Sequence, residues 1–234
     1  MWLKKTVAAV IPVTRNKNSI FNVIQELDAT GYTDEIIVVD IGADDETLRQ
    51  IGKTRARIVR QKMGGVGRAI KTGIKSTKAD LIIITEANGT FKGKDISKLL
   101  SYSEDFDTVF GSRTHLPLAG VGSGMTLLRR LVEDLFAKII CILFLSSNLT
   151  DVGCTCRLTN RRGWQAVAKE CKNNGEIFLT QWLITAAKNK VRFIEVPVNY
   201  IAPKMATQEN NFYHLTVRAL LIFYLIFKIW LTRT

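Results

Sequence analysis

Two polar side chains, Glu86 and Asn88, follow an apolar run that is typical of a buried strand, Leu81–Thr85. They are two residues apart, so on an extended segment both side chains point the same way. Their oxygen atoms suit a hard divalent cation such as Mg²⁺ or Mn²⁺. Because one of these two ligands is a neutral amide, we expect the cation to bind weakly unless an anionic ligand binds with it.

Two more loops are expected at the same place. They follow the apolar runs Val7–Val13 and Glu35–Asp40, and ligands of parallel sheets bind beyond the carboxyl ends of strands. The first loop carries Thr14 and Asn16. The Asp40 carboxylate can accept hydrogen bonds from a base edge or a ribose hydroxyl. The alternative is that Asp40 only ends its strand in a turn.

A glycine-rich turn, Gly64–Gly67, precedes an expected helix over Gly67–Ser76. Glycines at a helix start let backbone N–H groups approach a phosphate. An ordinary turn at a helix start would show the same residues, so the sequence leaves both interpretations open.

Apolar runs alternate with segments of helical spacing, which predicts an α/β fold with a mainly parallel sheet. Besides the three strands already named, strands are expected over Arg57–Val59, Asp107–Phe110 and Val191–Val198. Pro197 favours an edge position for the last of these strands. Further helices are expected over Ser19–Leu27 and Asp44–Ile51.

The segment Thr126–Leu145 predicts an amphipathic helix within residues 126–147. Arg130, Asp134 and Lys138 recur every four residues on one face, and the last turns are uninterrupted apolar sequence. A helix of this kind suits a membrane interface.

The C-terminal run Leu215–Leu231 is almost wholly apolar. As a helix it would reach roughly 25 Å, short of the ~30 Å hydrocarbon core of a bilayer. Arg218 and Lys228 flank its most apolar part, and basic residues beside an apolar helix favour anionic lipid surfaces. We expect this helix to lie in the membrane interface or to be shallowly inserted. A spanning helix and a buried core helix are the alternatives.

The composition suits one α/β domain with a membrane-contacting appendage, or at most two small domains. The 234 residues have a net charge of +12, which suits nucleic acid, anionic lipid or a phosphorylated substrate. No aromatic platform or groove-reading helix is evident, so we expect no nucleic-acid partner. The four cysteines form no C-x-x-C pair and are interpreted as free thiols in a reducing compartment. No small-residue cleavage site follows the first apolar run, so we expect a cytoplasmic domain.

Five motifs in order resemble the family 2 glycosyltransferases of GT-A fold, in the dolichyl-phosphate mannose synthase-like branch that uses polyprenyl phosphates. The motif E-A-N-G-T-F, residues 86–91, stands where this family usually reads D-A-D-G-T-F. The other motifs are I-P-V-T-R-N over 11–16, V-V-D-I-G over 38–42, G-V-G-R-A-I-K-T-G over 65–73, and D-V-G-C-T-C-R-L over 151–158 with G-S-R upstream over 111–113. The resemblance extends from about Val7 to Tyr200.

This resemblance implies a GT-A domain over residues 1–203 and a membrane-associated helix over 204–234. It implies inverting transfer, in a single displacement, of a sugar from GDP-mannose or a UDP-hexose to a polyprenyl phosphate of dolichyl type. A divalent cation, Mg²⁺ or Mn²⁺, would be held by Glu86 and Asn88. The residues implied to bind the donor are Pro12, Thr14, Asn16, Asp40, Gly42, Gly67, Glu86 and Asn88.

The resemblance also implies that Arg113 and an arginine of the pair Arg129-Arg130 bind the acceptor phosphate, because a guanidinium makes bidentate contacts with phosphate oxygens. The alternative for the pair is a solvated or lipid-facing basic surface. Asp151 would orient the acceptor or act as a base, and Arg157 would join the phosphate site or pair with Asp151. The implied partners are a nucleotide sugar, a polyprenyl phosphate lipid and an anionic membrane at its cytoplasmic face. A homo-oligomer stays open.

Acids of the family pattern are replaced at four positions, and each change removes negative charge from the expected catalytic side. A non-catalytic homologue that binds the donor or a partner subunit is therefore the alternative function. A processive synthase would show Q-x-x-R-W and several spanning helices, and a sugar nucleotidyltransferase would carry its glycine-rich signature after the first strand. The four replaced positions are Asn16, Ile41, Asn88 and Gln181.

Overall fold

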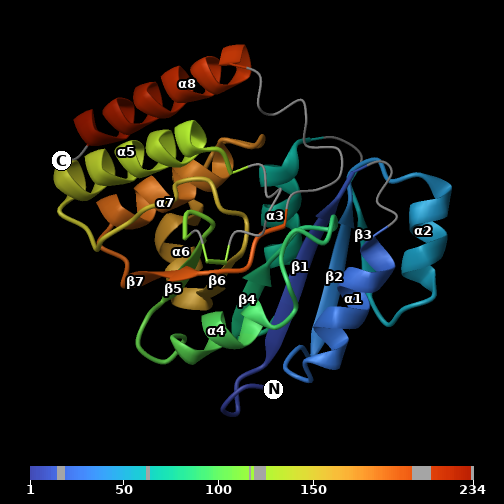
Figure 1. The fold of residues 1–234 in the computed structure, drawn as a ribbon. Coiled ribbons are helices and arrows are strands. Elements are labelled where there is room, and N and C mark those ends of the chain that lie inside the picture. Colours follow the sequence, from blue (N-terminus) through green and yellow to red (C-terminus); the bar gives the residue numbers. More distant parts are fainter. Residues whose placement is uncertain (15–18, 62–63, 116, 119–124, 202–211, 233–234) are drawn as a thin grey trace.

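The structure is a computed structural model that describes residues 1–14, 19–61, 64–115, 117–118, 125–201 and 212–232. Within these ranges seven strands form one sheet in the order β3-β2-β1-β4-β6-β5-β7 (Figure 1). All neighbouring strands are parallel except at β6, which is antiparallel to both β4 and β5. The strands are β1 (Val7–Val13), β2 (Glu35–Asp40), β3 (Arg57–Arg60), β4 (Leu81–Ile84), β5 (Thr108–Ser112), β6 (Arg157–Asn160) and β7 (Phe193–Pro197).

Helices cover both faces of the sheet, because the central strands β1 and β4 are wholly apolar and alternate residues point to opposite sides. Val7, Ala9 and Ile11 of β1 face one layer, whereas Ala8 and Val10 face the other. The first layer contains α1 (Ile20–Ala29), α2 (Asp45–Gly52) and α4 (Asp95–Ser101). The second contains α3 (Val66–Lys75), α5 (Leu127–Phe144), α6 (Arg161–Ala168), α7 (Phe178–Lys188) and α8 (Phe212–Leu231).

The elements predicted from the sequence are present, with ends that differ by at most three residues. The α/β class with a mainly parallel sheet is confirmed, and Pro197 lies in the edge strand β7. Strand β6 was not predicted, because the sequence R-L-T-N has neither an apolar run nor alternation. Helices α4, α6 and α7 were also not predicted.

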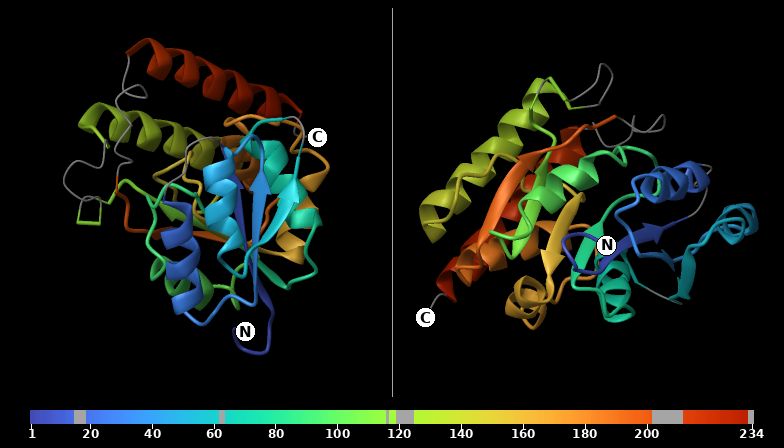
Figure 2. Two further views of the ribbon diagram at one scale, coloured as in Figure 1. Left: turned by 90° about the vertical axis from the view of Figure 1, so that its right-hand side faces the viewer. Right: turned by 90° about the horizontal axis from the view of Figure 1, so that it is seen from below.

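Helices α5 and α8 lie side by side at one side of the molecule (Figures 1 and 2). Helix α8 buries Ile222, Leu225, Ile226 and Ile229 in the core shared with α5 and α7. In the part of the chain that the structure describes, no helix is both long enough and apolar enough to cross a membrane. The four buried residues show that the C-terminal helix packs against the domain through one of its faces.

Candidate functional site

The carboxyl ends of β1, β2 and β4 lie side by side at one edge of the sheet, as the sequence predicts. Val13 lies opposite Asp40, and the Ile41 N–H donates to the Val13 carbonyl at 3.0 Å. The Ser19 hydroxyl donates to the Ala87 carbonyl at 2.8 Å, which joins the start of α1 to the loop after β4. These contacts bring three polar loops to one edge.

The residues predicted to hold the nucleoside are distributed along this edge. Pro12 is half-buried in β1, and Thr14 is exposed directly after that strand. Asn16 lies outside the described residues. One oxygen of Asp40 accepts the N–H of Gly42 at 2.9 Å and that of Ala43 at 2.8 Å.

The Asp40 carboxylate therefore closes the turn that the alternative interpretation requires. Among the described residues, its second oxygen accepts no hydrogen bond and is available to a ligand. Both roles are compatible with this geometry, and the contact with a nucleoside stays a prediction.

Gly67 is explained by packing. A Cβ at this position would lie 2.7 Å from Cγ of Phe178, which is the first residue of α7. The N–H of Arg68 also donates to the Asn174 carbonyl at 3.1 Å. Close approach between α3 and the segment before α7 therefore accounts for this glycine, so contact between Gly67 and a phosphate stays a prediction.

Glu86 and Asn88 lie close together after β4 and are joined by Thr90. The Asn88 amide donates to a Glu86 oxygen at 2.8 Å, and the Thr90 hydroxyl lies 3.1 Å from that same oxygen. The Asn88 carbonyl oxygen accepts from the Thr90 N–H at 3.2 Å and lies 2.8 Å from its hydroxyl. The backbone N–H thus fixes which way the amide points.

This loop offers a divalent cation one carboxylate and one amide oxygen. Within the described residues, no three His, Cys, Asp or Glu side chains gather where they could hold a metal. The pair fits a cation held chiefly by another ligand, with Glu86 supplying the protein's charge.

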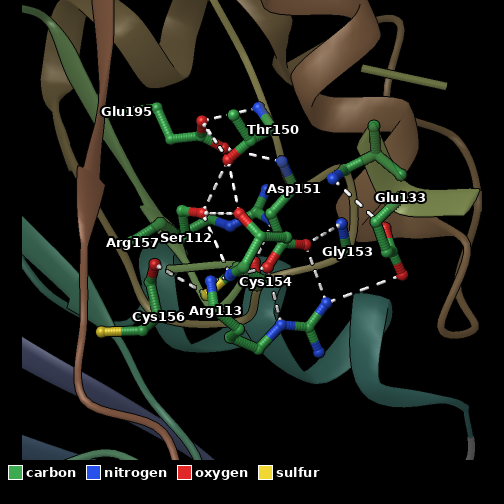
Figure 3. A network of polar contacts seen from close by, with 12 residues as sticks. Ser112, Arg113, Glu133, Thr150, Asp151, Gly153, Cys154, Cys156, Arg157 and Glu195 are labelled. Carbon is green, nitrogen blue, oxygen red and sulfur yellow. Dashed lines mark hydrogen bonds and ion pairs between the residues drawn. The ribbon is translucent and has the colours of Figure 1, made fainter. Parts of the chain in front are cut away.

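A buried ion pair between Arg113 and Asp151 forms the second half of the site (Figure 3). Nε and Nη2 of Arg113 each donate at 2.8 Å to one of the two Asp151 oxygens. The backbone N–H groups of Arg113 and Gly153 donate to the same carboxylate, each at 2.9 Å. Four hydrogen bonds therefore hold Asp151.

Both members of this pair are charged at neutral pH. Burial would raise the pKa of Asp151, but the Arg113 guanidinium and the backbone donors outweigh burial and hold that pKa at about 2. Burial would lower the pKa of Arg113, but Asp151 raises it well above its ordinary value. A carboxylate with a pKa near 2 is a weak proton acceptor at neutral pH. Of the two roles predicted for Asp151, the geometry favours orientation over base catalysis.

Tyr200 joins the two halves of the site. The Arg113 guanidinium lies over the Tyr200 ring at 5.6 Å, and the ring centres of Tyr200 and Phe91 are 5.7 Å apart. The Ile201 N–H donates to the Thr90 carbonyl at 2.9 Å. A short segment after β7 thus connects the Glu86 loop to the arginine that is predicted to bind the acceptor.

The other predicted arginines have different surroundings. Arg129 is buried at the start of α5, whereas Arg130 is half-buried, so Arg130 fits a solvated or lipid-facing position better. Arg157 lies between the rings of Phe110 and Trp182, at 5.0 and 5.2 Å, and donates to the backbone rather than pairing with Asp151. Burial lowers the pKa of Arg157 to about 10. A phosphate contact by any of the three stays a prediction.

Three charged residues of this cluster were not predicted. Glu133 is buried in α5, with one oxygen 3.7 Å from Nη2 of Arg113, and Arg218 of α8 contacts the same oxygen. Glu195 of β7 accepts the N–H groups of Thr150 and Asp151, at 2.6 and 2.9 Å. An acid among apolar strand residues, as in F-I-E-V, was the signal that could have identified Glu195.

Glu195 makes stability depend on pH. Burial and then the Asp151 charge raise its pKa from 4.5 to about 8. Between these values the unfolded chain loses a proton that the folded chain keeps, so this residue's contribution to stability falls as pH rises from about 4.5 to 8. The loss is on the order of 5 kcal/mol.

We expect Glu195→Gln to lower Tm at pH 5, because one backbone N–H loses its acceptor. The Tm difference from the wild type should shrink between pH 5 and pH 8, because only the wild type carries the titrating acid. Scanning calorimetry at several pH values measures this. Glu170→Gln is the control, because the pKa of Glu170 is lowered and its contribution is complete above 4.5. A constant difference for Glu195→Gln would contradict the prediction.

Comparison with known proteins identifies the family. The family model described as Glycosyl transferase family 2 matches residues 9–166. UDP-N-acetylglucosamine--dolichyl-phosphate N-acetylglucosaminyltransferase of Methanococcus voltae is 24% identical over 84% of this chain and 86% of its own length. Dolichyl-phosphate beta-glucosyltransferase of Homo sapiens is 26% identical over 72% of this chain, which spans 56% of that relative's length.

Solved structures show the same architecture. Glucosyl-3-phosphoglycerate synthase from Mycobacterium tuberculosis, in complex with Mn²⁺, UDP and glucosyl-3-phosphoglycerate, has a TM-score of 0.70 at 15% identity, over 98% of this chain and 80% of that chain. The same enzyme with Mg²⁺ and UDP has a TM-score of 0.68 at 16% identity, over 93% and 79%. The GT-A fold expected from the motifs is confirmed. The family match covers more than half of the chain, which therefore belongs to glycosyl transferase family 2 and is a glycosyltransferase.

Proposed function

We propose that this enzyme transfers a hexose from a nucleotide diphosphate sugar to a polyprenyl phosphate of dolichyl type. One observation carries the proposal: the buried Arg113–Asp151 pair contacts α5 through Glu133, and α5 and α8 expose apolar side chains beside it. A phosphate-binding group beneath an apolar surface suits an acceptor that is a phosphate at one end and a hydrocarbon at the other. The names of the relatives, which act on dolichyl phosphate, support the same acceptor class.

The donor is proposed to be a uridine nucleotide sugar. The Methanococcus voltae relative is named for UDP-N-acetylglucosamine, and the similar solved structures contain UDP. This support favours a UDP-hexose over GDP-mannose. The nucleoside would lie at Asp40 and Gly42, and the diphosphate beside Glu86.

In the proposed reaction, an oxygen of the acceptor phosphate forms a bond to the anomeric carbon. The bond from that carbon to the donor's β-phosphate oxygen breaks, and the nucleoside diphosphate leaves with the electron pair. A phosphate monoester has a second pKa near 6, so it attacks without a strong protein base. Asp151, ionised and hydrogen-bonded to Arg113, keeps the guanidinium in place for the acceptor. A divalent cation beside Glu86 and Asn88 would neutralise charge on the diphosphate.

We propose peripheral attachment to the cytoplasmic face of a membrane, through α5 and α8. Both helices bury one face in the domain and expose another that is largely apolar, and exposed apolar patches mark interaction surfaces. Lys228 is exposed on α8, where it suits anionic lipid. The exposed apolar residues are Leu127, Leu128, Leu131, Leu135, Ile142, Val217, Leu220, Leu221, Phe223, Tyr224, Phe227, Trp230 and Leu231.

The function is tested by a transfer assay with labelled nucleotide sugars, a polyprenyl phosphate and organic extraction of the lipid-linked product. We expect transfer by the wild type and at least about tenfold less by Arg113→Lys, because lysine cannot keep both contacts with Asp151 or a bidentate contact with phosphate. Nucleotide affinity should stay within about twofold. Equal loss of nucleotide affinity and transfer would contradict the division into donor and acceptor halves.

The metal prediction follows from the single carboxylate near the cation position. Mg²⁺ or Mn²⁺ and nucleotide should bind synergistically, because the diphosphate supplies charge that Asn88 does not. Asn88→Asp should tighten metal binding about tenfold or more, and Glu86→Ala should abolish the synergy. Calorimetric titration of nucleotide with and without metal measures both. The non-catalytic alternative would be favoured if divalent cations did not change the nucleotide affinity and Glu86→Ala had no effect on it.

Membrane attachment is tested with the exposed faces, because truncation would also remove core residues of α8. The combined variant Leu131→Ser, Leu135→Ser, Phe223→Ser and Phe227→Ser should float with anionic liposomes at least about tenfold less than the wild type, since each change removes apolar area. Tyr102→Ser, at the end of α4 in the other helix layer, is the control and should float normally. If the fourfold variant floated as well as Tyr102→Ser, the exposed faces of α5 and α8 would be ruled out as the membrane-binding surface.

A further inference from the structure

Arg218 lies in α8, beyond the residues that the family model matches. The sequence predicted that it would face anionic lipid beside the apolar run. Instead its Nη2 donates to Oε1 of Glu133 on α5 at 2.9 Å. The Glu133 side chain is 5% exposed and that of Arg218 is 35% exposed. Arg218 therefore reaches inward and contacts an almost fully buried carboxylate.

Glu133 depends on this contact for charge balance. Arg113 is engaged at 2.8 Å by both oxygens of Asp151, whereas its Nη2 lies 3.7 Å from Glu133. The second Glu133 oxygen accepts a weak bond from the Val152 N–H at 3.3 Å. A buried carboxylate that loses its ion-pair partner is strongly unfavourable. Without Arg218, Glu133 and Asp151 would compete for the one guanidinium of Arg113.

The loop that contains Asp151 is shaped around the tip of Arg218. A Cβ on Gly153 would overlap the Arg218 guanidinium and would lie 3.2 Å from Nη2 of Arg113. The N–H of the same glycine donates to Asp151. Two arginines from distant parts of the chain thus approach one glycine, and a side chain there would displace the end of Arg218.

We propose that Arg218 is a positioning residue for the acceptor phosphate. It neutralises Glu133 and so keeps Asp151, rather than Glu133, as the carboxylate that holds the Arg113 guanidinium. The inference rests on the proposed function, in which Arg113 receives the phosphate. The same ion pair, between Arg218 and Glu133, links the packing of α8 on α5 to acceptor binding.

The test compares Arg218→Met with a matched variant, Arg57→Met. Arg57 pairs with Glu35 at 2.7 Å in strands β3 and β2, far along the sheet from the acceptor half. Transfer is assayed with a short-chain polyprenyl phosphate in detergent, so that membrane binding does not limit the rate. Arg218→Met should raise KM for the acceptor about tenfold, while kcat and nucleotide affinity stay within about twofold. Arg57→Met should leave all three values unchanged.

A second substitution separates positioning from general destabilisation. Glu133→Gln removes the uncompensated charge, so in the Arg218→Met background it should return the acceptor KM to within about threefold of the wild type. Arg218→Lys, which keeps the charge and is the safer variant for folding, should give an intermediate KM. An unchanged KM in Arg218→Met, or no recovery in the double variant, overturns the inference while wild-type transfer upholds the proposed function. A wild type that transfers no sugar to any polyprenyl phosphate overturns both.

Discussion

The buried ion pair between Arg113 and Asp151 is the interaction around which the proposed acceptor half of the protein is organised. Two charges removed from water are unfavourable unless each is closely paired and hydrogen-bonded. The surrounding chain meets this requirement with two backbone N–H groups, the Tyr200 ring and the loop that ends in β6. Strand β6, inserted antiparallel between β4 and β5, brings that loop back beside Arg113.

The two halves of the site distribute negative charge differently. The proposed donor half has one carboxylate where its motif usually has two, whereas the proposed acceptor half gathers the carboxylates of Asp151 and Glu133 around Arg113. Asp151 and Glu133 are buried and both lie against the Arg113 guanidinium, so their role here is to orient that cation. A donor diphosphate and its cation would supply charge where the protein has little of its own.

Local patterns predicted the elements well and the charge pairs poorly. The strands Val7–Val13 and Glu35–Asp40 are apolar runs whose bounds the structure reproduces to the residue. The loops after β1, β2 and β4 could be brought together from the sequence, because the carboxyl ends of parallel strands share an edge. Glu133 and Arg218 are 85 residues apart, and only the packing of α8 on α5 shows that they meet. The spacing of residues within one helix does not show which residue of a neighbouring helix will contact it.

The strand order also bears on how the chain is made. Strands β1 to β4 are the first four in the sequence, and β3-β2-β1-β4 is one continuous half of the sheet. These four strands and the helices between them are therefore synthesised before β7 and α8. Glu133 of α5 is synthesised before its ion-pair partner, because Arg218 lies in α8. A chain interrupted before α8 would leave the buried Glu133 without its Arg218 partner and would lack the apolar residues that α8 adds to the core.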